Sequence, residues 1–232
     1  MSIERYVVAA VHSWNRRIFE EVLVRNPGEW TLIDQPADLT VARLADLRPR
    51  YVFLMHWSWK VPAEIVERYE CIGFHMTDLP YGRGGSPLQN LILRGHRETK
   101  LTAFRMVDEM DAGPIYLKAP LALDGSAQEI YIRASMLAAD LIAEILERRP
   151  APAPQQGEPV VFRRRSPEES LLPESAGPQQ LYDFIRMLDA DGYPRAFLER
   201  GTWRCEFLRA SLDGELVRAE ARLSPIRGAR QS

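Results

Sequence analysis

Short apolar runs alternate with amphipathic segments over the first part of the chain. The apolar runs, which predict strands, are residues 6–11, 30–33, 51–55 and 71–74. The segments between them, residues 16–24, 39–47 and 63–69, place apolar side chains at helical spacing. Alternation of strands and helices is typical of a parallel sheet that is flanked by helices. The pattern therefore predicts an α/β domain with a mostly parallel sheet.

The later part of the chain has a different pattern. Ser86 and Pro87 suit the N-cap and first position of a short helix through residue 93. Further predicted elements are strands 99–107 and 113–118, a long helix 128–146, a helix 179–188, and two or three strands within 196–223 with a hairpin turn at Asp213-Gly214. Repeated prolines make 150–159 a linker. We therefore expect a larger domain at residues 1–149, which would be the catalytic domain, a small α+β or β-rich domain at residues 160–226, and a tail at residues 227–232.

Composition narrows the class of protein. Hydrophobic residues make up 46% of the 232 residues and charged residues 27%, which is ordinary for a globular protein. The net charge of −2 argues against a protein built to neutralise nucleic-acid phosphates. Cys71 and Cys205 lack the spacing of a metal or redox pair, so we expect free thiols and no metal. Without a long apolar run or a secretory signal, we expect a cytoplasmic protein that does not bind membranes.

One stretch combines a histidine, a glycine-rich turn and a later aspartate. His75 ends a predicted strand, the turn 81–85 follows it, and Asp111 precedes Ala112 and Gly113. Parallel sheets bind ligands at the carboxyl ends of their strands. An imidazole changes charge near neutral pH, so His75 could carry a proton or donate a hydrogen bond to an oxyanion. Asp111 could orient the imidazole or a water molecule, or accept the proton.

These residues resemble the active-site core of the folate-dependent formyltransferases. The resemblance implies a Rossmann-like domain with a smaller C-terminal domain, and 10-formyltetrahydrofolate as cosubstrate. It also implies catalytic roles for His75 and Asp111, and a turn at the active site in which Gly84 lies near the substrate and Arg83 either holds the substrate or braces the turn. Residues 164–169, 181–188 and 192–197 resemble the C-terminal domain of the sugar and tRNA formyltransferases.

The chain departs from the family pattern at one position. The family's Asn-x-His reads Gly73-Phe74-His75 here, so the asparagine that polarises the formyl carbonyl is absent. His56 and Asn15 follow predicted neighbouring strands, and Asn90 is also available. We rank His56 first as the replacement donor, then Asn15, then backbone or water. Loss of activity is the other explanation.

The resemblance also implies where the other ligands bind. The folate would lie between the loop after residue 55 and the stretch 106–111, where backbone groups hold the pterin. The expected folate-binding residues are Trp57, Met106, Val107, Asp108 and Met110. Trp14 and Asn15 follow the first strand and are candidates for substrate contacts, although packing or a helix cap would also account for them.

The acceptor is expected to be a small-molecule amine. The stretches 56–60 and 74–90 look most like formyltransferases of pseudaminic or legionaminic acid pathways, so an amino sugar is the first expectation, with no nucleic-acid partner. The alternatives are methionyl-tRNA, hydroxyornithine, hydrolysis of the formyl donor, and an inactive formyltransferase-like binding protein. A homodimer is possible.

Overall fold

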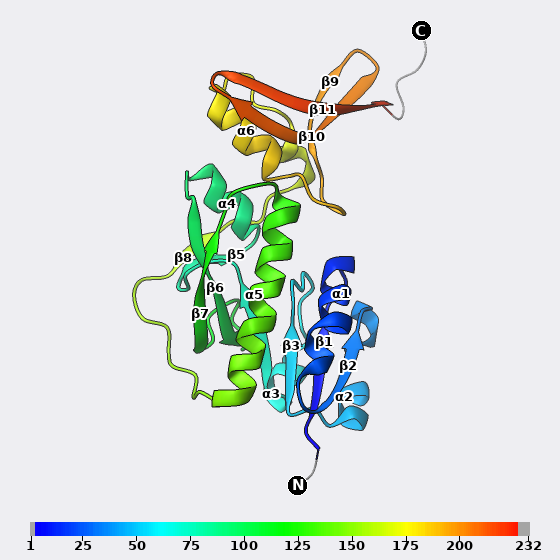
Figure 1. Ribbon diagram of the computed structural model, residues 1–232, viewed down its shortest axis with the longest axis vertical. Coiled ribbons are helices and arrows are strands. Elements are labelled where there is room, and N and C mark those ends of the chain that lie inside the picture. Colours follow the sequence, from blue (N-terminus) through cyan, green and yellow to red (C-terminus); the bar gives the residue numbers. More distant parts are fainter. Residues whose placement is uncertain (1–2, 227–232) are drawn as a thin grey trace. The chain divides into compact units, whose positions relative to one another are not determined.

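The protein divides into two compact units, and each contains several segments of the chain. The structure, a computed structural model, describes residues 3–226 (Figure 1). The first unit contains the residues up to Pro87, Thr99–Leu121 and Ile132–Phe162. The second contains Leu88–Glu98, Ala122–Tyr131 and the chain from Arg163. This division differs from the expected boundaries, because the linker belongs to the first unit and two earlier segments belong to the second. The expected tail 227–232 lies outside the described residues.

A six-stranded sheet with the order β2-β1-β3-β4-β6-β7 forms the centre of the first unit. Its strands are β1 (Arg5–Ala9), β2 (Glu29–Ile33), β3 (Tyr51–Leu54), β4 (Cys71–His75), β6 (Glu98–Arg105) and β7 (Ile115–Ala122). The first four strands pair in parallel and β6 pairs antiparallel with β4. The predicted mostly parallel α/β sheet is thus confirmed.

The helices begin and end close to the predicted segments. They are α1 (Ser13–Glu21), α2 (Val41–Leu47), α3 (Ala63–Arg68), α4 (Pro87–Leu93), α5 (Ala127–Arg148) and α6 (Pro178–Arg186). Two details differ from expectation. Trp14 and Asn15 lie in the first turn of α1, whose N-cap is His12, and Ser86 has φ +50° instead of the extended backbone of an N-cap. No helix among residues 3–226 is long and apolar enough to cross a membrane.

Alternate strand residues explain how one face of the sheet is covered. Val7, Val52 and Cys71 on β1, β3 and β4 share a cluster with Leu44 of α2 and Ile65 of α3, and all five are almost inaccessible to solvent. Residues two apart on a strand point to the same face, so the continuous apolar runs of these strands give both faces of the sheet apolar side chains, and this cluster covers one of them. The packing holds the carboxyl ends of β1, β3 and β4 at one edge, where the predicted site residues lie.

The glycine-rich turn after β4 is a strand and not the expected loop. β5 (Tyr81–Gly84) pairs in parallel with β8 (Val160–Phe162). Figure 1 shows the linker leaving the end of α5 and running to β8 beside β5. Gly84 has φ +102°, and a Cβ on it would lie 2.5 Å from the Phe162 carbonyl oxygen. Only glycine allows this close pairing.

The second unit combines α6 with a three-stranded sheet of order β11-β10-β9. Its strands are β9 (Ala196–Arg200), β10 (Trp203–Asp213) and β11 (Leu216–Pro225), and all neighbours are antiparallel. The hairpin turn falls at Gly214-Glu215, one residue after the predicted Asp213-Gly214, because Asp213 still pairs with Leu216. The expected small β-rich C-terminal region is confirmed.

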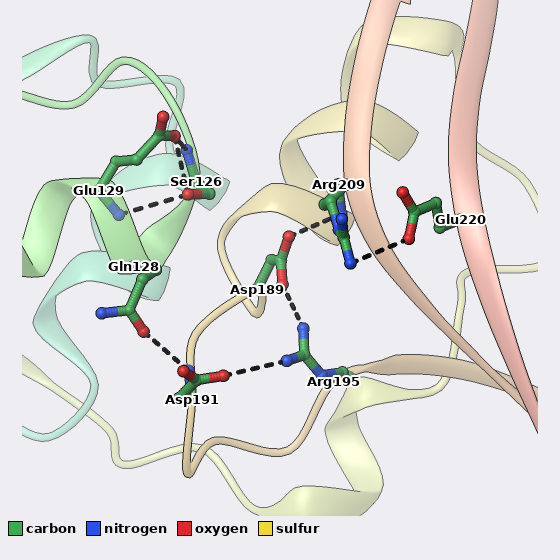
Figure 2. Close-up of polar contacts among 8 residues, drawn as sticks. All are labelled: Ser126, Gln128, Glu129, Asp189, Asp191, Arg195, Arg209 and Glu220. Atoms are coloured by element: carbon green, nitrogen blue, oxygen red, sulfur yellow. Dashed lines mark hydrogen bonds and ion pairs between the residues drawn. The ribbon is translucent and has the colours of Figure 1, made fainter.

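A polar network connects three segments within the second unit (Figure 2). The Asp189 carboxylate pairs with Arg195 and accepts the Arg209 backbone N–H at 2.6 Å. Gln128, in the first turn of α5, donates its backbone N–H to the Asp189 carbonyl at 2.9 Å, and its Oε1 accepts from the backbone N–H of Asp191. Arg209 interrupts the β10–β11 register with φ +51°. The buried Asp189 carboxylate therefore fixes both the turn after α6 and the irregular register of β10 at Arg209.

Candidate active site

His75 ends β4 and is held by the following strand. Its side chain is buried, and its Nε2 lies 2.7 Å from the Gly82 carbonyl oxygen. A carbonyl oxygen only accepts hydrogen bonds, so Nε2 carries the proton in this contact. The other ring nitrogen, Nδ1, is then the one available for chemistry.

Asp111 lies on the Nδ1 side of that imidazole. Its Oδ2 is 3.7 Å from His75 Nδ1 and accepts the Gly84 backbone N–H at 2.8 Å. The structure therefore brings the predicted histidine and aspartate together. The 3.7 Å separation is longer than a direct N–H···O bond, and catalytic contacts commonly tighten only when substrate binds.

The place of the missing asparagine is filled by other side chains. Gly73 pairs with Phe104 across β4 and β6. A Cβ on Gly73 would lie 2.9 Å from Phe104 Cε1 and 3.3 Å from Met106 Cγ. The Phe104 and Met106 side chains therefore occupy the space that an asparagine side chain at position 73 would need.

His56, the first candidate for the missing donor, has aromatic neighbours that follow β1. Its ring centroid lies 4.6 Å from that of His12 and 5.9 Å from that of Trp14. Burial, followed by the neighbouring His12, lowers the pKa of His56 to about 3, so the ring is neutral at pH 7. A neutral imidazole can still donate one hydrogen bond. These contacts place the ring towards β1, whereas His75 ends β4 on the other side of β3.

Trp14 and Asn15 hold the edge of the sheet together. The Trp14 ring stacks on His12 with centroids 4.3 Å apart. Asn15 is fully buried, and its Nδ2 donates to the Met55 carbonyl at 3.2 Å. That bond connects α1 to the loop after β3. Asn15 Oδ1 is buried and has no hydrogen-bond partner among the described residues.

The two stretches expected to flank the folate lie next to each other. Trp57 and Met106 both pack against the apolar cluster of β1, β3, α2 and α3. Lys60 Nζ lies 3.8 Å from Asp108 Oδ1, although both side chains are largely exposed. Val107 and Met110 are 40% and 68% exposed. The loop after β3 and the stretch after β6 therefore offer an accessible apolar edge in the expected position.

Arg83 contacts the second loop of the site. Its Nη1 lies 3.3 Å from Glu109 Oε1, and its Nε and Nη2 donate to Gln155 Oε1 at 3.1 and 2.8 Å. These contacts favour the bracing role of the two roles left open for Arg83. Gln155 has no signal in the sequence, because it stands in a proline-rich run that reads as a linker. The role of the Gly82 carbonyl was equally hidden, since backbone groups leave no trace in residue types.

No group of three or more His, Cys, Asp or Glu side chains within residues 3–226 has the arrangement of a metal site.

Two protein-family models match the chain. "Formyl transferase" matches residues 22–145, and "Methionyl-tRNA formyltransferase, C-terminal domain" matches residues 167–224. The first match covers more than half of the chain, including His75 and Asp111. This chain belongs to the formyltransferase family.

Known relatives carry related names. A methionyl-tRNA formyltransferase from Methylobacterium nodulans is 34% identical over 156 residues, which are 62% of this chain and 50% of that protein. The chain thus spans about half the length of the curated relatives that it matches. A solved structure described as methionyl-tRNA formyltransferase from Clostridium thermocellum is 42% identical, with a TM-score of 0.93, and the match covers 96% of this chain and all of that one. A sugar N-formyltransferase from a Shewanella species shares the fold at 16% identity and a TM-score of 0.65, over 85% of this chain and 93% of that one.

Proposed function

We propose that this formyltransferase moves a formyl group from 10-formyltetrahydrofolate to an amine. The observation that carries the proposal is the His75–Asp111 pair, whose Nδ1 and Oδ2 lie 3.7 Å apart. The sequence resemblance assigns these two residues to the family's catalytic histidine and aspartate. Both side chains are fixed by backbone groups of β5, at Gly82 and Gly84. Preorganised polar groups of this kind stabilise charge without reorganising during the reaction.

The proposed reaction proceeds through a tetrahedral intermediate. The neutral amine attacks the formyl carbon, and a C–N bond forms while the formyl oxygen becomes an oxyanion. Asp111, directly or through water, takes a proton from the attacking nitrogen. Asp111 passes this proton to His75 Nδ1, which carries none while Nε2 donates to the Gly82 carbonyl. The bond between the formyl carbon and N10 of the folate then breaks, and Nδ1 delivers the proton to N10. The products are the N-formyl amine and tetrahydrofolate.

The formyl oxygen still needs a hydrogen-bond donor, because Gly73 provides none. His56 keeps its first rank from the sequence, because a neutral imidazole can donate one hydrogen bond. Asn15 is less available, because its Nδ2 already donates to Met55, and Asn90 Nδ2 donates to the Arg163 carbonyl at 3.1 Å. Removing one oxyanion donor typically costs about 10²- to 10³-fold in rate. A His56→Ala enzyme with normal turnover would exclude this role and move it to backbone or water.

Methionyl-tRNA is the acceptor that the relatives' names support best. The curated relatives and the 42% identical solved structure are named methionyl-tRNA formyltransferases, and the C-terminal family match has the same description. Amino sugars were our first expectation from the sequence, and the comparisons favour the alternative instead. The comparisons also do not support our expectation that the protein has no nucleic-acid partner.

An amino sugar is the second candidate, and one observation favours it. Several arginines of the C-terminal sheet are engaged by carboxylates: Arg204 by Glu199 and Glu206, Arg209 by Glu220, and Arg218 by Asp213. Binding to tRNA depends on cations that neutralise phosphates. A surface on which such cations already have acidic partners suits a small acceptor better.

The test is an assay of the purified protein with 10-formyltetrahydrofolate and two acceptor sets, methionyl initiator tRNA and a panel of amino sugars, both free and nucleotide-linked. We expect a formylated product in one set, detected by its mass, with release of tetrahydrofolate. His75→Ala and Asp111→Ala should each lower turnover by about 10²-fold or more. Tetrahydrofolate release without an acceptor would indicate hydrolysis. Donor binding without turnover would indicate the inactive-member alternative, and near-full activity of either variant would refute the assignment.

A further inference from the structure

The linker after α5 contributes a side chain to the active site. We propose that Gln155 is a positioning residue that locks the Asp111 turn and the Arg83 strand around His75. This inference rests on the proposed formyl transfer. All of these residues belong to the first unit.

Every hydrogen-bonding position of the Gln155 amide is used. Its Nε2 donates to the carbonyl oxygens of Asp111 at 2.7 Å and Gly113 at 2.9 Å. Its Oε1 accepts from Arg83 Nε and Nη2 at 3.1 and 2.8 Å. An amide has two N–H groups and two acceptor positions, so this set is complete. Neither a carboxylate nor a cationic side chain could satisfy both sides.

The Asp111 turn needs such support, because its backbone is strained. Asp111 has φ +52°, a left-handed conformation that is uncommon for a residue other than glycine. Such conformations persist only where the surroundings fix them. The Gln155 bonds to both carbonyls of the turn provide this restraint from one side. On the other side, a Cβ on Gly113 would lie 1.7 Å from the Arg105 carbonyl oxygen, so this part of the turn is pressed against β6.

The linker is anchored on both sides of Gln155. Ala153 and Ile115 exchange two backbone hydrogen bonds, at 2.7 and 2.9 Å. After Gln155, β8 pairs with β5, and Phe162 is 2% exposed with its ring edge-on to Tyr81. The amide is therefore presented from a fixed backbone, as a positioning group requires.

The consequence concerns the geometry of catalysis. The Asp111 carboxylate faces His75 only while its turn is held, and β5 supplies the backbone groups that orient both catalytic side chains. Gln155 connects the Asp111 turn to Arg83 of β5. A misplacement of about 1 Å in a catalytic group can cost about 10²-fold in rate. The turnover rate should depend mainly on the Nε2 side of the amide, because its bonds to the Asp111 and Gly113 carbonyls hold the strained turn.

Three variants test this role. Gln155→Ala removes both halves of the contact. Gln155→Glu can still accept from Arg83 but places a carboxylate oxygen against two carbonyl oxygens. Gln156→Ala is the matched control, because Gln156 is the same residue type at the next, exposed linker position. We expect kcat to fall by about 10- to 10²-fold in both Gln155 variants, with the KM for the folate donor changed by less than about twofold, and the Gln156 variant to match wild type.

A second readout does not depend on activity. The Gly84 amide donates to Asp111 Oδ2, so its hydrogen exchange should become about 10-fold faster or more in both Gln155 variants. The Val52 amide, which is bonded to Glu70 within the sheet, should stay unchanged. Unchanged exchange at Gly84 in Gln155→Ala, or wild-type kcat in Gln155→Glu, would overturn the positioning role. Failure of formyl transfer in the wild-type enzyme would instead count against the proposed function, and the exchange measurement would still decide the role of Gln155.

Discussion

At the scale of single residues, burial of an imidazole makes this protein sensitive to acid. The pKa of His56 is lowered to about 3 by burial and by its neighbour His12, whose own pKa is also lowered by burial. The unfolded chain binds a proton to these rings near pH 6.5. Protonation therefore favours the unfolded state once the pH falls below that value. The stability that neutral His56 contributes is present above about pH 6.5 and is lost as the pH falls towards 3.

His56→Gln removes this titration while keeping a polar side chain of similar length. We expect the free energy of unfolding of wild type, measured by urea denaturation, to fall more steeply between pH 6.5 and 4 than that of the variant. Carboxylates titrate in both proteins, so the difference between the two curves isolates the imidazole. Parallel curves would show that His56 can take up a proton in the folded protein at little cost.

The candidate pair His75 and Asp111 was predictable from the sequence, but the side chains and backbone groups that hold it were not. His75 and Asp111 carry recognisable chemistry at recognisable positions. The bond of Asn15 to Met55 and the four bonds of Gln155 depend on contacts between distant segments. A buried bracing amide has the same residue type as an exposed linker amide, so the sequence does not distinguish them.

At the scale of elements, the pairing of β4 with β6 explains why the missing asparagine cannot simply be restored. Gly73 lies opposite Phe104, which is 4% exposed. We expect Gly73→Asn to lower the free energy of unfolding by about 1–3 kcal/mol, the usual cost of overpacking a core. Urea denaturation measures it.

A compensating change provides the control. Gly73→Asn combined with Phe104→Leu should recover part of the lost stability, because the smaller side chain makes room for the new Cβ. If Gly73→Asn alone were as stable as wild type, the space would be open. The glycine would then have replaced the asparagine without any change in the surrounding packing.

Elements with a strong local pattern were predicted and those without one were missed. Most strands of the large sheet are short apolar runs, and helices α2 to α6 have apolar side chains at helical spacing, so the prediction placed them close to their observed bounds. β5 and β8 are short, contain or follow glycine and proline, and form only by pairing with each other. Their existence depends on a contact between distant segments, which local propensity does not report.

At the scale of the whole molecule, one buried arginine connects the segments of the second unit. The Arg186 side chain is 2% exposed, and its Nε donates to Asp183 Oδ1 at 2.6 Å. Its Nη1 donates to the carbonyl oxygens of Leu123 at 2.6 Å and Gly125 at 2.9 Å. A single side chain therefore ties α6 to the segment before α5.

Arg186→Leu should destabilise the protein strongly. The change leaves a buried carboxylate without its main cation, and removal of one partner of such a pair typically costs about 3–5 kcal/mol. Arg97→Leu is the matched control, because Arg97 contacts the same Asp183 carboxylate at 3.3 Å but is 58% exposed. That change should cost only about 0–1 kcal/mol. Equal losses in thermal or urea unfolding would contradict this account of the second unit.

The attachment of the linker to the first unit bears on how such proteins can recombine. A crossover at the proline run would join Gln155 and Phe162 of one parent to Arg83, Asp111 and Gly84 of another, and would separate contacts that fit only as a set. A crossover after Phe162 would keep this set intact. In evolution, and in chimeras made by design, the proline-rich segment should therefore be inherited together with the chemistry, while new C-terminal sheets are exchanged downstream of it.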